Sequence, residues 1–203
     1  MTDSRRTFLS AADSYVAQVA RIPAGTLTGP GLGDWDLRSL VGHASRSLVT
    51  VETYLDQPAE AVDVKTAADY YVAIARTGGA NGPAVVERGR QAGLALGDDP
   101  AAYVAGLADR VRTKLERYAA SYVLTTIAGG MRLGEYLRTR TFELVVHGHD
   151  IAAASGVTPD LEDAALVDAA TLAAEVAVRT GRGADLLLAV TGRRPLPAGF
   201  SVV

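Results

Sequence analysis

Apolar residues recur every three or four positions along most of the chain, a spacing that predicts helices with one buried face. The pattern predicts four long helices, at residues 4–21, 35–55, 98–120 and 133–154. Asp34 and Asp99 stand where a side-chain oxygen can cap a helix, and Pro100 suits the first helical position. Gly156 is expected to end the fourth helix, because glycine readily adopts the left-handed conformation found at such ends.

Weaker periodicity marks several shorter elements. It predicts short helices at residues 66–77, 83–95, 161–181 and 184–192. Residues 121–131 combine β-branched side chains with a Gly-Gly pair, so a short extended segment that runs into a turn is expected there. No internal repeat or linker divides the chain. The sequence therefore predicts an all-α four-helix bundle with additional short helices, as a single domain over residues 1–203.

The charge balance argues against two classes of partner. Lys and Arg number 20 against 23 Asp and Glu, and the net charge of −3 gives no basic footprint for nucleic acid or for an anionic membrane. No apolar run approaches the ~18 residues of a membrane span, and the N-terminus lacks the apolar core of a signal peptide. We therefore expect a cytoplasmic protein that binds neither nucleic acid nor membrane.

The chain contains no cysteine. Disulfides, thiolate metal ligands and a protein thiol nucleophile are all excluded by this absence. Any sulfur chemistry at this protein must therefore use a thiol that arrives from outside.

One face of the helix predicted at 133–154 concentrates the polar chemistry. Steps of three and four place six residues in one strip: Tyr136, Arg140, Glu143, His147, Asp150 and Ala154. Apolar residues flank the strip on both sides, so it is expected to face inward or into a cleft. Ionised side chains are costly to bury unless they are paired or bind something. His149 projects to nearly the opposite side of this helix and is not part of the strip.

Glu143 and His147 are four residues apart, so both can reach one cation that lies between their turns. His43, at the border of the apolar stripe of the helix at 35–55, is the candidate for a third ligand, because His149 points away. Two other interpretations remain open at this point. His43 can be a hydrogen-bonded core histidine, and Glu143 can form an intrahelical ion pair with Arg140.

The two remaining ionised residues of the strip are candidate catalytic residues. Asp150 is placed to accept a hydrogen bond from the free nitrogen of a metal-bound imidazole. Arg140 can pair with Glu143 or with an anionic group of the substrate, and an ordinary buried ion-pair network is the alternative. Trp35 and the tyrosines are interpreted as packing residues. Three other arginines are expected to be exposed to solvent: Arg138, Arg193 and Arg194.

Three segments together resemble the mycothiol-dependent maleylpyruvate isomerase family, within the DinB-like superfamily of four-helix metalloproteins. These segments are WDLRSLVGHASRSL, LRTRTFELVVHGHDIA and LLLAVTGRRPLPAGFSV. The resemblance implies a divalent metal, typically zinc, held by one histidine of the second helix and by an E-x-x-x-H pair. The matching residues here are His43, Glu143 and His147. It also implies mycothiol as a cosubstrate, whose sulfur takes the open position on the metal.

The isomerase that gives this family its name carries an additional C-terminal α/β domain, for which a chain of 203 residues has no room. We therefore expect an S-transferase, or an isomerase-like enzyme, that acts on a small electrophile other than maleylpyruvate. Two other classes are a DinB-like hydrolase, with water at the open metal position, and a non-catalytic binding bundle. Measurements of metal content and of thiol affinity would distinguish these three classes of function. The protein is expected to be a monomer or a homodimer.

Overall fold

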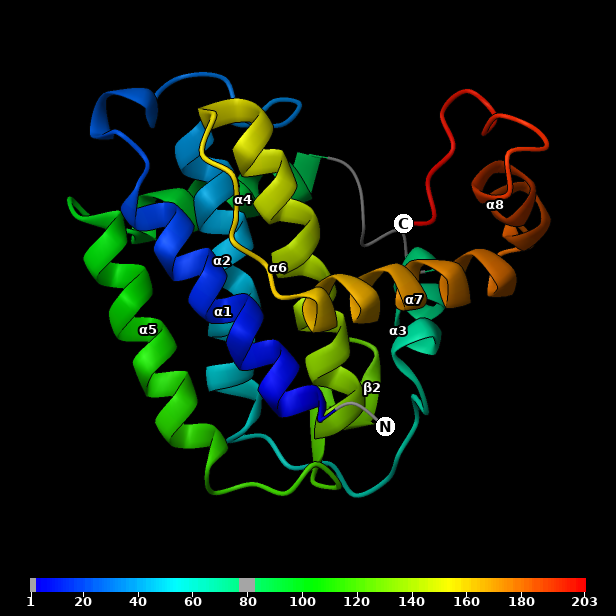
Figure 1. Ribbon diagram of the computed structural model, residues 1–203. Coiled ribbons are helices and arrows are strands. Elements are labelled where there is room, and N and C mark those ends of the chain that lie inside the picture. The colour runs from blue at the N-terminus through cyan, green and yellow to red at the C-terminus, as the bar shows by residue number, and fades with distance from the viewer. Residues whose placement is uncertain (1–2, 77–82) are drawn as a thin grey trace.

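Four long helices form the body of the structure, a computed structural model that describes residues 3–76 and 83–203 (Figure 1). They are α1 (Ser4–Ala20), α2 (Leu37–Tyr54), α5 (Pro100–Leu115) and α6 (Leu133–Ser155). Both α1 and α2 pack against α5 and α6, so the four helices close around a common core. The prediction of an all-α, DinB-like bundle is confirmed.

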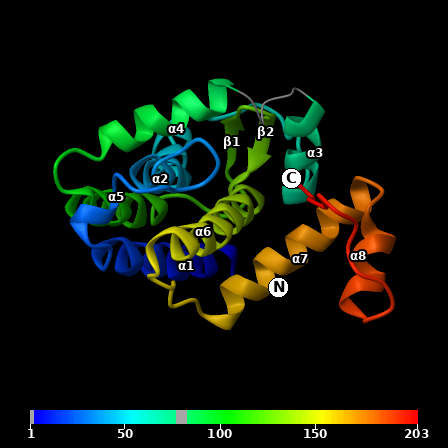
Figure 2. The ribbon, with the colours of Figure 1, turned by 90° about the horizontal axis from the view of Figure 1, so that it is seen from above.

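The shorter elements cover this bundle on two sides. They are the 3-10 helix η1 (Ala24–Thr26), α3 (Ala67–Arg76), α4 (Pro83–Ala95), β1 (Val123–Thr126), β2 (Gly129–Arg132), α7 (Asp163–Arg179) and α8 (Gly183–Val190). Helix α4 packs along α2, whereas α7 packs on α6 and α3. Seen from above, α2 and α5 lie on one side of α6, and α3, α7 and α8 lie on the other (Figure 2).

Most predicted helix ends agree with the structure. Asp99 caps α5 by accepting from the backbone N–H of Ala102, and Pro100 is the first helical residue. Gly156 ends α6 with a left-handed φ of 75°. Helix α5 stops at Leu115, five residues before its predicted end. Thr77, the last residue of the short helix predicted at 66–77, lies outside the described residues.

The cap predicted at Asp34 is wrong, because the second helix begins at Leu37 and Asp36 caps it. An oxygen of Asp36 accepts from the backbone N–H of Ser39 at 2.7 Å. The preceding residues form a small closed loop in which the N–H of Gly31 donates to the carbonyl of Trp35 at 2.9 Å. This loop keeps the chain extended through the residues that the periodicity assigned to the helix.

The extended segment predicted at 121–131 forms the antiparallel hairpin of β1 and β2. Its second strand leads directly into α6 at Leu133. The loop before α3 crosses this hairpin, where the N–H of Val64 donates to the carbonyl of Gly130 at 3.0 Å. A Cβ at Gly130 would lie 2.0 Å from the carbonyl oxygen of Ala61, so only glycine permits this crossing. The crossing brings α3 beside α6.

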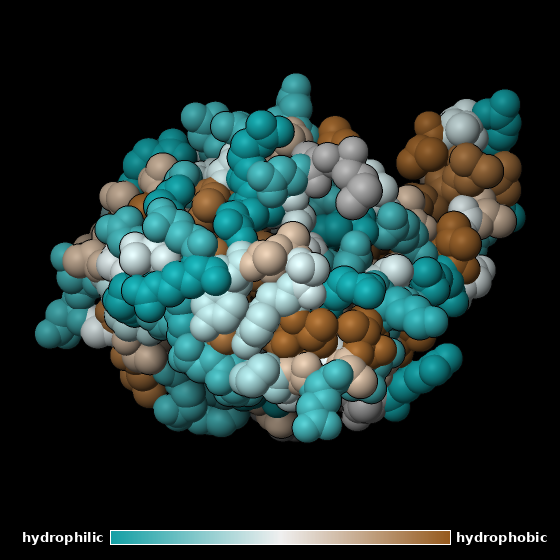
Figure 3. Space-filling view, turned by 90° about the horizontal axis from the view of Figure 1, so that it is seen from below, coloured by the Kyte–Doolittle hydropathy of each residue, from teal (hydrophilic) through white to brown (hydrophobic). Residues whose placement is uncertain are grey.

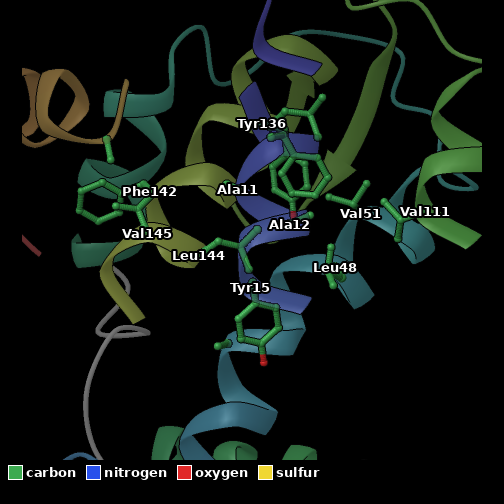
Figure 4. Packing of buried hydrophobic residues seen from close by; sticks show 14 of the residues in the cluster. Ala11, Ala12, Tyr15, Leu48, Val51, Val111, Tyr136, Phe142, Leu144 and Val145 are labelled. Atoms are coloured by element: carbon green, nitrogen blue, oxygen red, sulfur yellow. The ribbon is translucent and has the colours of Figure 1, made fainter. Parts of the chain in front are cut away.

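The core lies between α1, α2, α5 and α6, and Figure 4 shows Tyr15 of α1, Leu48 and Val51 of α2, and Tyr136 and Leu144 of α6 within it. These side chains are almost completely buried. The hydroxyl of Tyr15 donates to the carbonyl of Val41 at 2.7 Å, so its polar end is satisfied. This packing fixes α2 relative to α6.

The solvated position predicted for Arg138 is wrong. Its guanidinium lies between α6 and α7, with Asp168 at 2.9 Å, Glu175 at 3.3 Å and Glu135 at 3.5 Å. Only 18% of the side chain is exposed. Two of the three carboxylates, Asp168 and Glu175, come from α7, which the sequence pattern could not place beside α6. Arg193 and Arg194 are exposed, as predicted.

The C-terminal arm is unlike the body of the molecule. No residue of α8 is buried, and Leu187 and Val190 are 62% and 73% exposed. Apolar side chains gather on the projecting part of the surface in Figure 3, where Figures 1 and 2 place α8. Among the described helices, none is long and apolar enough to cross a membrane. The core is therefore built without α8.

Helices α2 and α4 meet backbone to backbone at Gly42 and Gly93. A Cβ at Gly42 would lie 2.2 Å from the backbone nitrogen of Gly93, and a Cβ at Gly93 would lie 2.9 Å from Cα of Ser39. The Nε–H of Arg38 donates to the carbonyl of Gly93 at 2.9 Å and holds the contact. This close crossing sets the position of the turn of α2 that follows Gly42.

We predict that Gly42→Ala lowers the free energy of unfolding by about 1–3 kcal/mol, because overpacking forces the two backbones apart. Denaturant unfolding measures the change. Gly106→Ala, in α5, is the matched control, since its Cβ would meet only Arg110 at 3.6 Å. That control should be neutral or stabilise the protein by up to ~1 kcal/mol. Equal effects of the two substitutions would contradict the close contact.

Candidate metal centre

Three side chains of metal-ligand type converge between α2 and α6. His43 comes from α2, and Glu143 and His147 come from α6. One possible ligand atom from each lies within 4.8 Å of the other two. The rings of His43 and His147 stand edge to face, with centroids 4.9 Å apart. The structure thus brings together the three residues that the sequence singled out.

Four of the six residues of the strip predicted on α6 line a cavity, in agreement with the expectation that it is not a solvated face. The cavity has a volume of about 630 Å³ and is lined by side chains of α2, α3, α4 and α6. Arg140 and Asp150 line it together with the three converging residues, and Val203 reaches it from the C-terminal segment. His149 is exposed on another face of the helix, as predicted.

His147 is held between two carboxylates. Its Nδ1–H donates to Oδ2 of Asp150 at 2.9 Å, and its Nε2 lies 3.3 Å from Oε2 of Glu143. Burial lowers the pKa of His147, but hydrogen bonds to Asp150 and Glu143 outweigh burial and raise the pKa to about 9. The bond to Asp150 fixes the ring so that Nε2 points at the cluster. Asp150 therefore lies where the sequence placed an acceptor for this imidazole.

Glu143 is an ionised carboxylate in a largely enclosed place. Burial raises its pKa, yet the hydrogen bond from His147 and the charge of Arg140 bring the pKa down to about 2. The hydroxyl of Tyr71, from α3, donates to Oε1 of Glu143 at 2.7 Å. Tyr71 is a site residue that the sequence interpretation missed, because it counted the tyrosines as packing residues.

His43 is a neutral imidazole with no hydrogen bond to the described part of the chain. Its Nδ1 is buried and has no partner there. Burial lowers its pKa to about 4, and the charge of His147 acts in the same direction. Trp35 packs against the ring at 4.4 Å between centroids, and the indole N–H donates to the carbonyl of Val86 at 2.9 Å. The alternative of a hydrogen-bonded core histidine is therefore wrong.

Arg140 is a buried cation that rests on aromatic rings. Its Cζ lies 5.1 Å from the ring centroid of Tyr136 and 5.5 Å from that of Tyr70, and 9% of the residue is exposed. Its Nε–H donates to the hydroxyl of Thr139 at 3.0 Å. Among residues 3–76 and 83–203, no carboxylate oxygen lies within 4.0 Å of the guanidinium. The predicted alternative of a direct Arg140–Glu143 ion pair is therefore wrong.

Two imidazoles and one carboxylate form the donor set of many catalytic zinc sites, which keep a fourth position open. His43 has a free lone pair at neutral pH, and Glu143 is ionised. His147 carries a proton at neutral pH in the absence of a cation, and a bound cation would displace it. The chemistry of the cluster therefore suits a divalent metal ion.

The chain matches the model of one known protein family. A model described as the mycothiol maleylpyruvate isomerase N-terminal domain matches residues 8–152, a range that contains His43, Glu143 and His147. No curated protein and no solved structure gives a significant match. The matched range runs from the first half of α1 to the last turn of α6 and so covers nearly all of the helical body around the cluster. The chain belongs to the mycothiol maleylpyruvate isomerase N-terminal domain family.

Proposed function

We propose that this protein is a metal-dependent enzyme that transfers the thiol of mycothiol to a small electrophile. His43, Glu143 and His147 would hold one divalent ion, and their donor set suits zinc best. The convergence of these three side chains at the wall of a cavity is the observation that carries the proposal. Membership of a family named for mycothiol supports the choice of thiol.

The unpartnered Nδ1 of His43 supports the assignment of a bound cation. A buried polar atom without a hydrogen bond is rare and needs an explanation. The neighbouring negative charge of Glu143 would offset the charge of a cation in this low-dielectric place. With three protein ligands, one coordination position is left for an exchangeable molecule.

A bound dication lowers the pKa of a coordinated thiol and so supplies a thiolate at neutral pH. The chain has no cysteine, so no protein thiol competes for that position. In the transfer, the thiol would release its proton to solvent and its sulfur would form a bond to an electrophilic carbon of the acceptor. The electron pair of the bond broken at that carbon would leave with the departing group or, in an addition to a double bond, take up a proton from solvent. The cavity of about 630 Å³ gives both molecules access to the same place.

Asp150 would orient His147 and raise its basicity as a ligand. The imidazole donates its Nδ1–H to Asp150, which leaves Nε2 as the ligand atom. Arg140 would bind an anionic group of the electrophile, because its guanidinium lines the cavity and has no carboxylate partner among the described residues. The two tyrosine rings beneath it stabilise the cation without neutralising it.

We predict that the zinc-loaded protein binds mycothiol, whereas metal-free protein and the His147→Ala variant do not. His147→Ala removes a ligand but should leave a folded bundle, since most of the core lies elsewhere. Isothermal calorimetry measures thiol binding, and turnover should be lost with it. His149→Ala is the matched control, because this exposed histidine lies on the same helix.

No binding at millimolar mycothiol, or equal turnover in metal-free protein, would overturn this function. Zinc binding without thiol affinity would favour a DinB-like hydrolase, in which water takes the open position. A protein that binds neither would favour a non-catalytic binding bundle.

Asp150→Asn is expected to weaken zinc affinity about 10–100-fold, the usual effect of losing an acceptor behind a ligating histidine. Competition with a fluorescent chelator measures the affinity. The control is Asp185→Asn, which removes the carboxylate that pairs with Arg194 at α8. This variant should leave the zinc affinity unchanged. Unchanged zinc affinity in Asp150→Asn would remove the proposed role of this carboxylate.

Arg140→Met is expected to raise KM about 10–100-fold for electrophiles that carry an oxyanion, since a hydrogen bond to a charged group contributes about 1.5–3 kcal/mol. KM for uncharged electrophiles should not change. Steady-state kinetics on matched pairs of acceptors provides the measurement, with Arg193→Met in the exposed tail as control. An equal rise in KM for charged and uncharged acceptors would contradict anion binding by Arg140.

A further inference from the structure

The two oxygens of Glu143 have different surroundings. Oε2 lies 3.3 Å from Nε2 of His147, on the side of the cluster. Oε1 instead accepts the hydroxyl proton of Tyr71 at 2.7 Å. Oε1 is therefore bonded to a side chain outside the cluster, whereas Oε2 faces His147 within it.

The Tyr71 hydroxyl has a single proton and two acceptors within reach. The carbonyl oxygen of Thr139 lies at 3.2 Å, and Oε1 of Glu143 lies at 2.7 Å. The shorter contact is also the one to a negatively charged acceptor, and hydrogen bonds to ionised groups are the stronger kind. The proton therefore belongs to the bond with Glu143.

Tyr71 has little freedom to leave this bond. Its ring is buried and packs edge to face against Phe142 of α6 at 5.3 Å and against Tyr70 at 5.6 Å between centroids. Helix α3 is tied down at its N-terminal turn. The backbone N–H of Ala67 donates to Glu135 at 2.9 Å, and Asp69 pairs with Arg179 at 2.7 Å.

We propose that Tyr71 is a positioning residue that makes Glu143 a monodentate ligand, by occupying Oε1 and leaving Oε2 alone for the metal ion. This inference rests on the proposed function, since it needs a metal at the cluster. A carboxylate that binds through both oxygens fills two coordination positions, and one that binds through a single oxygen fills one. Tyr71 would thus preserve the open position that the thiol requires.

The test replaces zinc with cobalt(II), whose visible d–d absorption is intense in four-coordinate sites and weak in five- or six-coordinate ones. Wild-type protein loaded with cobalt is expected to show the intense four-coordinate spectrum. Tyr71→Phe keeps the ring and loses the hydroxyl, so Glu143 becomes free to bind through both oxygens. The absorption should then fall severalfold, and cobalt affinity should drop about 10–100-fold.

Tyr122→Phe is the matched control, because it also removes a tyrosine hydroxyl that donates to the protein, here to the carbonyl of Leu55 at 3.1 Å. It should change neither the spectrum nor the affinity. Circular dichroism of both variants should match the wild type. A general loss of structure would show in that signal, whereas the loss of one orienting bond would not.

A second measurement needs no variant. Infrared difference spectra of the wild type on zinc binding report the separation between the antisymmetric and symmetric carboxylate stretches, which is wide for monodentate and narrow for bidentate binding. A wide separation is expected. A narrow separation, or a Tyr71→Phe variant with the wild-type cobalt spectrum and affinity, would overturn the inference while leaving the proposed function intact. A wild type that binds neither metal would overturn both.

Discussion

The ionised carboxylate of Glu143 is the constraint around which the site is organised. A buried charge of this kind is stable only where neighbouring groups compensate the loss of hydration. Three groups do so here: Tyr71 donates a hydrogen bond from α3, His147 approaches from one turn along α6, and the charge of Arg140 lies nearby. Much of the local architecture serves to place these groups around one pair of oxygens.

The positions of the other elements follow from this requirement. The hairpin of β1 and β2 and the loop that crosses it at Gly130 deliver α3 to the side of α6, where Tyr71 reaches the carboxylate. On the opposite side, the close contact of α2 with α4 at Gly42 fixes the next residue, His43, with Trp35 packed on its ring. The neutral imidazole of the cluster is thus held by packing, and its buried Nδ1 has no hydrogen-bond partner among the described residues.

The sequence predicted what depends on local periodicity. The strip on α6 follows directly from the helical repeat, and the choice of His43 over His149 follows from the faces on which these residues lie. The roles that depend on contacts between distant segments were missed. Tyr71 and Glu143 are 72 residues apart and meet only because of the hairpin crossing. Arg138 was expected in solvent, because nothing local indicates that α7 supplies two of its carboxylates.

The most direct test of a metal centre at this place is the anomalous difference map of crystals grown with zinc, with data recorded on both sides of the zinc absorption edge. A single strong peak is expected, with one nitrogen from each of His43 and His147 and one oxygen of Glu143 at about 2.0–2.2 Å. A well-ordered cluster with no peak at saturating zinc, or a peak on other side chains such as His149, would contradict it.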